Sequence, residues 1–320
     1  MAALVTFAGC GNDDAERPWQ RYHAELERAL GKGAITSSTP PNIGAYPERQ
    51  ARRFTIEETR GTLLGVYALR ECQITSLVAA RNNQLGRVAP PSQQWLYERE
   101  LWLRLDVCQR SEVPTSLSEE SQARLAELTH IKTEQLPYVG WNTLVDSSEW
   151  RSSFARASHA QPPDAFAEIE APLAALDYLE QMLRRQFDPR WEQDSSTLEH
   201  HLQVLQRRPL TAEVLRTLLL AQQRLNEATT YLDANYDDNA ACLPSWQTAW
   251  LDTLQADAER WLRAVEGALS ASPVTPPAAM RDYQRRWLAL DEEEAPWAQF
   301  LAARQQHEQA RARFQPCDED

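Results

Sequence analysis

Residues 214–232, VLRTLLLAQQRLNEATTYL, decide the fold class of this 320-residue chain. Apolar side chains recur here in steps of three and four residues. They are Val214, Leu218, Ala221, Leu225, Ala228 and Leu232. This spacing places all of them on one face of an α-helix. We therefore predict a long amphipathic helix that buries this stripe.

Two further segments have the same period. One stripe comprises Phe166, Ile169, Leu173, Leu176, Leu179, Leu183 and Phe187. The other comprises Trp246, Trp250, Leu254, Trp261, Val265 and Leu269. Each predicts a helix, and Pro172 is expected to kink the first of them because proline cannot donate a backbone hydrogen bond.

Weaker helical patterns cover most of the remaining chain, and strand-like alternation is scarce. These helices are predicted at about 17–30, 56–80, 93–110, 118–135, 147–158, 196–207, 278–290 and 297–314. Because no internal repeat of fixed length occurs, a regular solenoid is not expected. The predicted fold is all-α, an irregular and mainly antiparallel bundle of about ten helices.

A hydrophobic fraction of 42% gives the chain enough apolar residues for a sizeable core. We interpret residues 17–320 as a single helical domain. Within it, residues 31–47 contain the string Ser37-Ser-Thr-Pro-Pro41 and resemble a linker. This segment is interpreted either as a linker or as an ordered extended stretch that wraps the surface.

The net charge of −13 argues against a nucleic-acid partner. Such a partner requires a basic stripe that neutralises phosphates. Lysine occurs only at Lys32 and Lys132, and the arginines are scattered. No window has the roughly 18 continuous apolar residues of a membrane-spanning helix.

The first ten residues, MAALVTFAGC, end in small residues and Cys10. They resemble a lipobox, in which the cysteine thiol receives a diacylglycerol after cleavage of the leader. The polar run Gly11-Asn-Asp-Asp14 is typical of a tether. We interpret residues 1–16 as the remnant of a lipoprotein signal and its tether, with Cys10 as the lipidation site and the membrane as its partner.

The other cysteines are Cys72, Cys108, Cys242 and Cys317, and four cysteines allow three pairings. A helical hairpin that turns between residues 82 and 93 brings Cys72 and Cys108 to the same side. Their heights then differ by roughly 7 Å, against about 5.5 Å between the Cα atoms of a disulfide. A slightly later start of the second helix removes the mismatch. We therefore predict Cys72–Cys108 and, by elimination, Cys242–Cys317.

No spacing in the sequence demands catalysis, a cofactor or a metal. Asp233, Asn235 and Asp237 begin like a calcium loop, but Asp238 replaces the required glycine and Pro244 the bidentate glutamate. A nucleophile elbow and a phosphate-binding loop are both absent from the sequence. We identify no catalytic residue and expect neither a metal nor a cofactor.

Two groups of residues are candidates for ligand contacts. For the 11 tryptophans the favoured interpretation is core packing, and the alternative is a groove for a sugar ring or an apolar ligand, with Trp141 and Trp150 as its exposed members. Arg81, Asn82 and Asn83 are polar residues at a predicted helix end. The favoured interpretation is a helix C-cap, and the alternative is a polar cluster that faces a groove.

Several short strings together are similar to domain-of-unknown-function family 3080, a family of uncharacterised, mostly proteobacterial lipoproteins. In order they are Tyr46-Pro47, Glu71-Cys72, residues 81–88 (RNNQLGRV), Ser92, Tyr97-Glu98 and Cys108. They occupy the first third of the chain, and the family domain is expected to extend over nearly all of it. Serine is commoner in the family where this chain has Asn83, and the leader here is truncated. The resemblance implies an exported lipoprotein with paired cysteines and implies no activity.

These features predict a lipid-anchored protein on the periplasmic side of a bacterial cell envelope. Gly11, and not aspartate, follows Cys10, which favours the outer membrane. The favoured function is a structural or protein-interaction module with an envelope protein as its partner. The alternatives are a periplasmic binding protein for a small apolar or sugar ligand, and an envelope hydrolase with paired carboxylates.

Overall fold

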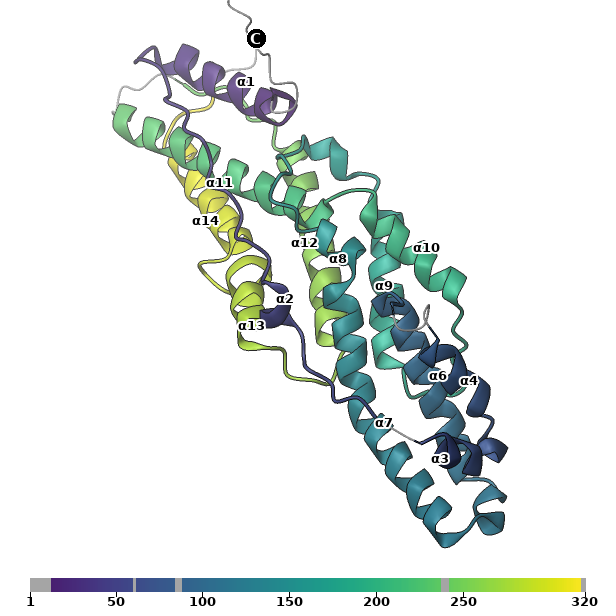
Figure 1. Ribbon diagram of the computed structural model, residues 1–320. Helices are drawn as coiled ribbons and strands as arrows, with labels where there is room; N and C mark the ends of the chain where they lie inside the picture. The colour runs from purple at the N-terminus through teal and green to yellow at the C-terminus, as the bar shows by residue number, and fades with distance from the viewer. Residues whose placement is uncertain (1–12, 60–61, 84–87, 237–241, 318–320) are drawn as a thin grey trace, which may run out of the picture.

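The computed structural model describes residues 13–59, 62–83, 88–236 and 242–317, which form an elongated all-α molecule (Figure 1). No β-strand occurs in these ranges; Leu243 and Pro316 form an isolated β-bridge. The all-α prediction is therefore confirmed. Within the same ranges, no helix is both long and apolar enough to cross a membrane.

The helices differ widely in length, and so do the segments that connect them. The helices are α1 (Asp13–Leu30), α2 (Arg49–Arg52), α3 (Leu63–Ala68), α4 (Thr75–Asn82), α6 (Pro91–Gln109), α7 (Glu119–Asp146), α8 (Ser148–Ser152), α9 (Glu170–Arg184), α10 (Ser195–Gln206), α11 (Leu210–Asn235), α12 (Ala249–Ser270), α13 (Ala278–Tyr283) and α14 (Pro296–Arg311). Short 3-10 helices lie at η1 (Arg70–Cys72), η2 (Val113–Ser116) and η3 (Pro163–Phe166), and a short π-helix lies at η4 (Gln284–Leu288).

The main hydrophobic core is built around α11, which packs along α14 and also contacts α1 and α12. All six residues of the stripe at 214–232 are buried in it, as the sequence predicts. Residues on both sides of this stripe, such as Leu215 and Leu219, are buried as well. The helix is therefore covered over more than one face.

A second, smaller core lies where η1 packs against the hairpin of α6 and α7. It includes Leu69, Ile74, Leu105 and Leu125. The disulfide Cys72–Cys108 joins η1 to α6 inside this core, with a Cα–Cα distance of 5.2 Å. It is the pairing expected from the helical hairpin.

The second disulfide, Cys242–Cys317, has a Cα–Cα distance of 4.8 Å and joins segments 75 residues apart. Beside it, Leu243 N donates to Gln315 O and Cys317 N donates to Leu243 O. The bridge therefore fastens the end of the described chain to the segment that precedes α12. This pairing also matches the expected one.

Residues 31–48 form no helix and run along the molecule from α1 to α2 (Figure 1). Ser38 N donates to Glu227 Oε1 at 2.9 Å, and Arg224 donates to Ser38 O at 2.9 Å. Ile43 is buried in the main core, and Trp287 packs directly on Gly44. Of the two interpretations, the ordered extended stretch that wraps the surface is the one the structure has.

The single helix predicted over 56–80 is wrong. Residues 53–59 are extended, and the helical part is divided among α3, η1 and α4. The Thr62 side chain accepts from Gly65 N and starts α3, while Gln73, with φ 58°, separates η1 from α4. A left-handed residue of this kind ends a helix, and it leaves no imprint on apolar periodicity.

The kink expected at Pro172 is also absent, because α9 begins later than predicted. Phe166 belongs to the turn η3, and Pro172 lies in the first turn of α9. The backbone nitrogen of a residue in the first turn has no intrahelical acceptor, so proline fits there without bending the helix.

Candidate functional site

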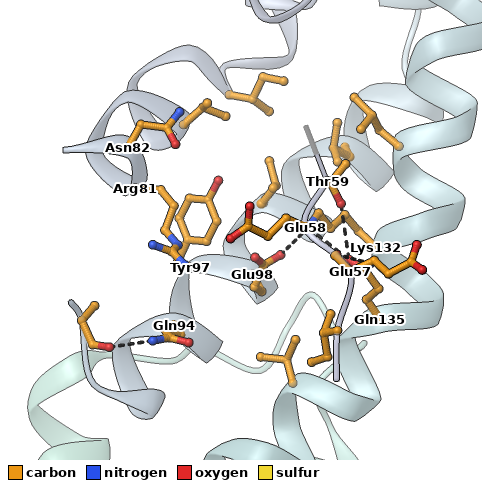
Figure 2. Close-up of a pocket in the computed structure, with 18 of the residues that line it drawn as sticks. Glu57, Glu58, Thr59, Arg81, Asn82, Gln94, Tyr97, Glu98, Lys132 and Gln135 are labelled. Atoms are coloured by element: carbon orange, nitrogen blue, oxygen red, sulfur yellow. Dashed lines mark hydrogen bonds and ion pairs between the residues drawn. The ribbon is translucent and has the colours of Figure 1, made fainter. Parts of the chain in front are cut away.

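A large cleft lies between α3 and α4 on one side and α7 on the other, with α6 at its base. Its volume is about 2740 Å³. The extended residues 53–59 run beside α7 and form part of its wall (Figure 1). Figure 2 shows Arg81, Asn82 and Tyr97 facing Glu57, Thr59 and Lys132 across this space.

An ion pair lies at the base of the cleft. Lys132 Nζ on α7 is 2.9 Å from Glu98 Oε2 on α6, and the two side chains are only 8% and 19% exposed. Gln135 Oε1 accepts from Lys132 at 3.3 Å, and Gln135 Nε2 donates to Glu57 O at 2.9 Å. Gln135 thus links the ion pair at the bottom of the cleft to the extended residues 53–59 (Figure 2).

An aromatic ring and a guanidinium lie opposite that wall. The Arg81 guanidinium is 5.9 Å from the centre of the Tyr97 ring, within the range of a cation–π contact. Burial, and then the Glu98 carboxylate, raise the pKa of Tyr97 to about 12, although Arg81 opposes this effect. Tyr97 therefore stays a neutral hydrogen-bonding phenol near pH 7 and is not a general base there.

The rim of the cleft carries large apolar side chains that face water. Leu64 is 82% exposed, Tyr67 is 60% exposed and Val88 is 79% exposed. All three line the cleft. Isolated exposed apolar residues are common, but a group around one concave surface is typical of an interaction site.

The wall at residues 53–59 is an extended backbone without a complete β partner. The Asn142 side chain accepts from Phe54 N and donates to Phe54 O, both at 2.9 Å. In the described part of the chain, the backbone groups of Thr55 and Ile56 make no hydrogen bond. Because neighbouring residues of an extended chain direct these groups to opposite sides, one of the two residues can pair with a strand laid in the cleft, as at the edge of a sheet.

Arginines gather at the end of the cleft where α7 stops. Asp146, the last residue of α7, is buried at a helix C-terminus, where the helix dipole disfavours an anion. Arg49, Arg52 and Arg53 contact its carboxylate at 3.0, 2.7 and 3.3 Å. Burial lowers the pKa of Arg53, Asp146 opposes this, and Arg49 and Arg52 add to it.

Of the polar residues predicted at a helix end, some line the cleft and one does not. α4 ends at Asn82 with Asn83 as its C-cap, so a helix end is present, although Asn83 has extended and not left-handed backbone angles. Arg81 and Asn82 line the cleft, and Asn83 is not among the residues that line it. Gly86 lies outside the described residues.

The alternative in which Trp141 and Trp150 are exposed ligand residues is wrong, because both are buried in the main core. Trp141 Nε1 donates to Arg52 O at 2.8 Å, and Trp150 Nε1 donates to the Tyr46 hydroxyl at 2.9 Å. Each indole N–H thus has an internal partner, and no ring face is left for a ligand.

Other candidates lie outside the cleft or outside the described ranges. Cys10 belongs to residues that the structure does not describe, and the cysteines of both disulfides lie away from the lining of the cleft. In the described part of the chain, no group of three or more His, Cys, Asp and Glu side chains is placed to hold a metal ion.

Sequence reasoning missed most of the cleft. Leu64 and Tyr67 were assigned to an ordinary helix, and Asp146 had no motif around it. One signal was present: Lys132 is one of two lysines in the chain. It takes one position of an apolar helical stripe that also contains Leu125, Leu128 and Leu136, where a lone lysine predicts a buried partner of opposite charge.

Some of the short strings that carry the family resemblance meet in the cleft. Arg81 and Asn82 from α4, Val88, and Tyr97 and Glu98 from α6 all line it. No curated protein and no solved structure matches the chain. A family model described as a protein of unknown function (DUF3080) matches residues 19–258, well over half of the sequence. The chain therefore belongs to the DUF3080 family of proteins of unknown function.

Proposed function

We propose that this protein is a lipid-anchored interaction module of the bacterial cell envelope, whose cleft holds an extended segment of a partner polypeptide. The observation that supports it is the meeting of two features at one concave surface. Leu64, Tyr67 and Val88 offer apolar contacts, and Thr55 and Ile56 offer unpaired backbone groups. Together they match β-strand addition, in which the backbone supplies affinity and side-chain pockets supply specificity.

The size of the cleft disfavours the small-ligand carrier. Pockets for small molecules usually measure about 300–1,000 Å³ and enclose most of the ligand. At about 2740 Å³, with exposed residues on its rim, this cleft suits a longer molecule. The tryptophans expected to contact a small ligand are buried in the core.

The chemistry of the cleft gives little support to a hydrolase. Glu98 at its base is paired with Lys132, and no histidine lines the cleft in the described residues. A pair of carboxylates that hydrolyses a bond needs one protonated acid and one base held on either side of the substrate. The Glu98 carboxylate is already in contact with the Lys132 ammonium, so it is not free to act on a substrate as one member of such a pair.

The helix α1 and the cleft walls formed by α3 and α4 lie towards opposite ends of the molecule (Figure 1). α1, which follows the tether that contains Cys10, is at one end, and α3 and α4 are near the other (Figure 1). A lipid on Cys10 would hold the α1 end at the membrane, on the periplasmic side and most simply at the outer membrane. The cleft would then face away from the lipid surface towards an envelope protein.

The test is a selection of random peptides on the purified full chain, followed by binding measurements. Leu64→Asp is expected to weaken the selected peptides at least about tenfold, because burying a carboxylate in an apolar contact is costly. Val107→Asp is the matched control, since Val107 is also exposed, on α6, but does not line the cleft. Equal affinity for both variants, or failure to select any peptide, would overturn the proposal.

A further inference from the structure

The arginine end of the cleft carries more positive charge than its one acid requires. Arg52 makes the shortest of the three contacts with Asp146: it lies behind the cleft, is buried, and also donates to Val145 O and Pro47 O. Arg49, Arg53 and Arg151 line the cleft in front of it. Three guanidinium groups thus contact one carboxylate and a fourth, that of Arg151, lines the same end of the cleft, in a chain whose net charge is −13.

The cleft-facing arginines have unused hydrogen-bonding capacity. Arg53 Nε is buried and makes no hydrogen bond of good geometry, although it lies 3.3 Å from Asp146. Arg151 donates to Ser147 O and has no ion pair with any described residue. Arg49 shares the Asp146 carboxylate that Arg52 already neutralises. Guanidinium groups in such a cluster are suited to a second carboxylate, which they bind through paired hydrogen bonds.

The position of this cluster relates it to the proposed docking of a peptide. The extended residues 53–59 follow α2, which contains Arg49, and run towards α3, which contains Leu64 and Tyr67 (Figure 1). Seven extended residues span about 20 Å, at roughly 3.3 Å per residue. A strand laid along this wall would place one end among the arginines while its other end contacts Leu64 and Tyr67.

We infer that Arg49, Arg53 and Arg151 bind a carboxylate of the docked polypeptide segment, and that this fixes the direction and register of the segment in the cleft. The inference rests on the proposed function. The ligand it describes is an extended segment with apolar side chains at one end. An acidic side chain or a C-terminal carboxylate lies about five to seven residues away, at the spacing set by the wall.

The test uses a selected peptide and its amide counterpart, with Glu→Gln at the acid or an amidated C-terminus. On the wild-type protein, the amide is expected to bind at least about tenfold more weakly. The Arg49→Gln/Arg151→Gln variant should weaken the acidic peptide by a similar factor and leave the amide unchanged. Arg263→Gln is the control, because Arg263 is 64% exposed and Arg49 66%, and Arg263 lies on α12 away from the cleft.

The outcomes separate the two proposals. If Leu64→Asp abolishes peptide binding but the amide counterpart binds wild type as tightly as the acidic peptide, the carboxylate inference is overturned and the docking proposal stands. If Leu64→Asp leaves the affinity of the peptide unchanged, both are overturned. If the arginine variant loses binding to vesicles with phosphate headgroups and not to the peptide, the cluster is a lipid site and the inference is overturned.

Discussion

Lys132 and Glu98 form a 2.9 Å ion pair that joins α7 to α6 at the base of the cleft. Neither side chain is more than 19% exposed, so each charge depends on the other for compensation. Two buried charges lose much hydration energy, and their attraction offsets this loss only while both are present. The pair therefore gives the cleft a defined base whose removal has a predictable cost.

Lys132→Met is expected to lower the free energy of unfolding by about 3 kcal/mol, because it leaves the buried Glu98 carboxylate without an opposite charge. Replacing both residues, as Lys132→Met/Glu98→Leu, should recover most of that loss, since no charge is then buried alone. Urea denaturation followed by circular dichroism measures both variants.

The control for this prediction is Arg263→Met, which breaks an exposed ion pair with Glu259. Exposed pairs contribute less than about 1 kcal/mol, so this variant should remain close to the wild type. If Lys132→Met costs no more than Arg263→Met, the ion pair at the base of the cleft has no structural role.

Apolar periodicity was enough to predict the core helices but not the cleft. The stripe from Val214 to Leu232 is buried because its spacing matches the turn of a helix, which is a local property. Residues 56–80 have similar apolar content, yet Leu64 and Tyr67 face water. Whether an apolar side chain packs inside or remains on a rim depends on which other segments cover it, and those contacts are tertiary.

The tryptophans also show that burial by distant segments cannot be predicted from local sequence. Trp141 and Trp150 stand outside the clear apolar stripes, which makes them the candidates for exposed aromatic residues. Each instead reaches an internal acceptor in a segment about 90 residues or more away in sequence. The disulfide pairing is predicted correctly, although Cys72 lies in the turn η1 and not in the continuous helix from which Cys72–Cys108 was inferred, and Cys242–Cys317 follows by elimination.

Gly44→Ala is predicted to destabilise the protein by about 1–3 kcal/mol. A Cβ at residue 44 would overlap the Trp287 indole, whose Cζ2 would lie only 2.8 Å away. The extended stretch or the ring must then move. In a Trp287→Leu background the cost of Gly44→Ala should shrink, which a double-mutant cycle of unfolding free energies detects. Additive effects would show that Gly44 and Trp287 are not in contact.

The unfolding free energy is predicted to fall with decreasing pH through His307. Its ring is fully buried between the Tyr22 and Thr229 hydroxyls, and burial, then the Arg311 charge, lower its pKa to about 3. The unfolded chain takes up this proton below pH 6.5 and the folded chain only near pH 3. Stability from this group is therefore complete above pH 6.5 and is lost between these values, by up to about 1.4 kcal/mol per pH unit.

Comparing pH profiles of unfolding tests the assignment to His307. His307→Gln should flatten the slope between pH 6.5 and 4, whatever its effect on absolute stability. His130→Gln, at an exposed position on α7, serves as control and should retain the wild-type slope. An unchanged slope in His307→Gln would assign the acid sensitivity to other groups.

Cys10→Ala in the full-length gene is predicted to move the protein from the membrane fraction to the soluble fraction. The proposed anchor depends on a thioether at this cysteine, and stable attachment requires more than one acyl chain. Membrane and soluble fractions, compared by immunoblot, measure the shift. Retention of Cys10→Ala at the membrane contradicts the anchor, whereas the docking proposal would be unaffected.

Removal of the Cys72–Cys108 bridge is predicted to loosen one wall of the cleft selectively. Cys72→Ala/Cys108→Ala opens a 36-residue loop, which should cost about 4 kcal/mol of stability, and frees η1 from α6. Hydrogen exchange should accelerate in α3 and α4, which contact the smaller core, and remain slow in α11. The matched control, Cys242→Ala/Cys317→Ala, opens a 75-residue loop at the α1 end and should leave exchange in α3 and α4 unchanged. Equal acceleration in both variants would mean that the disulfides act on global stability alone, and that neither one holds the cleft wall in place.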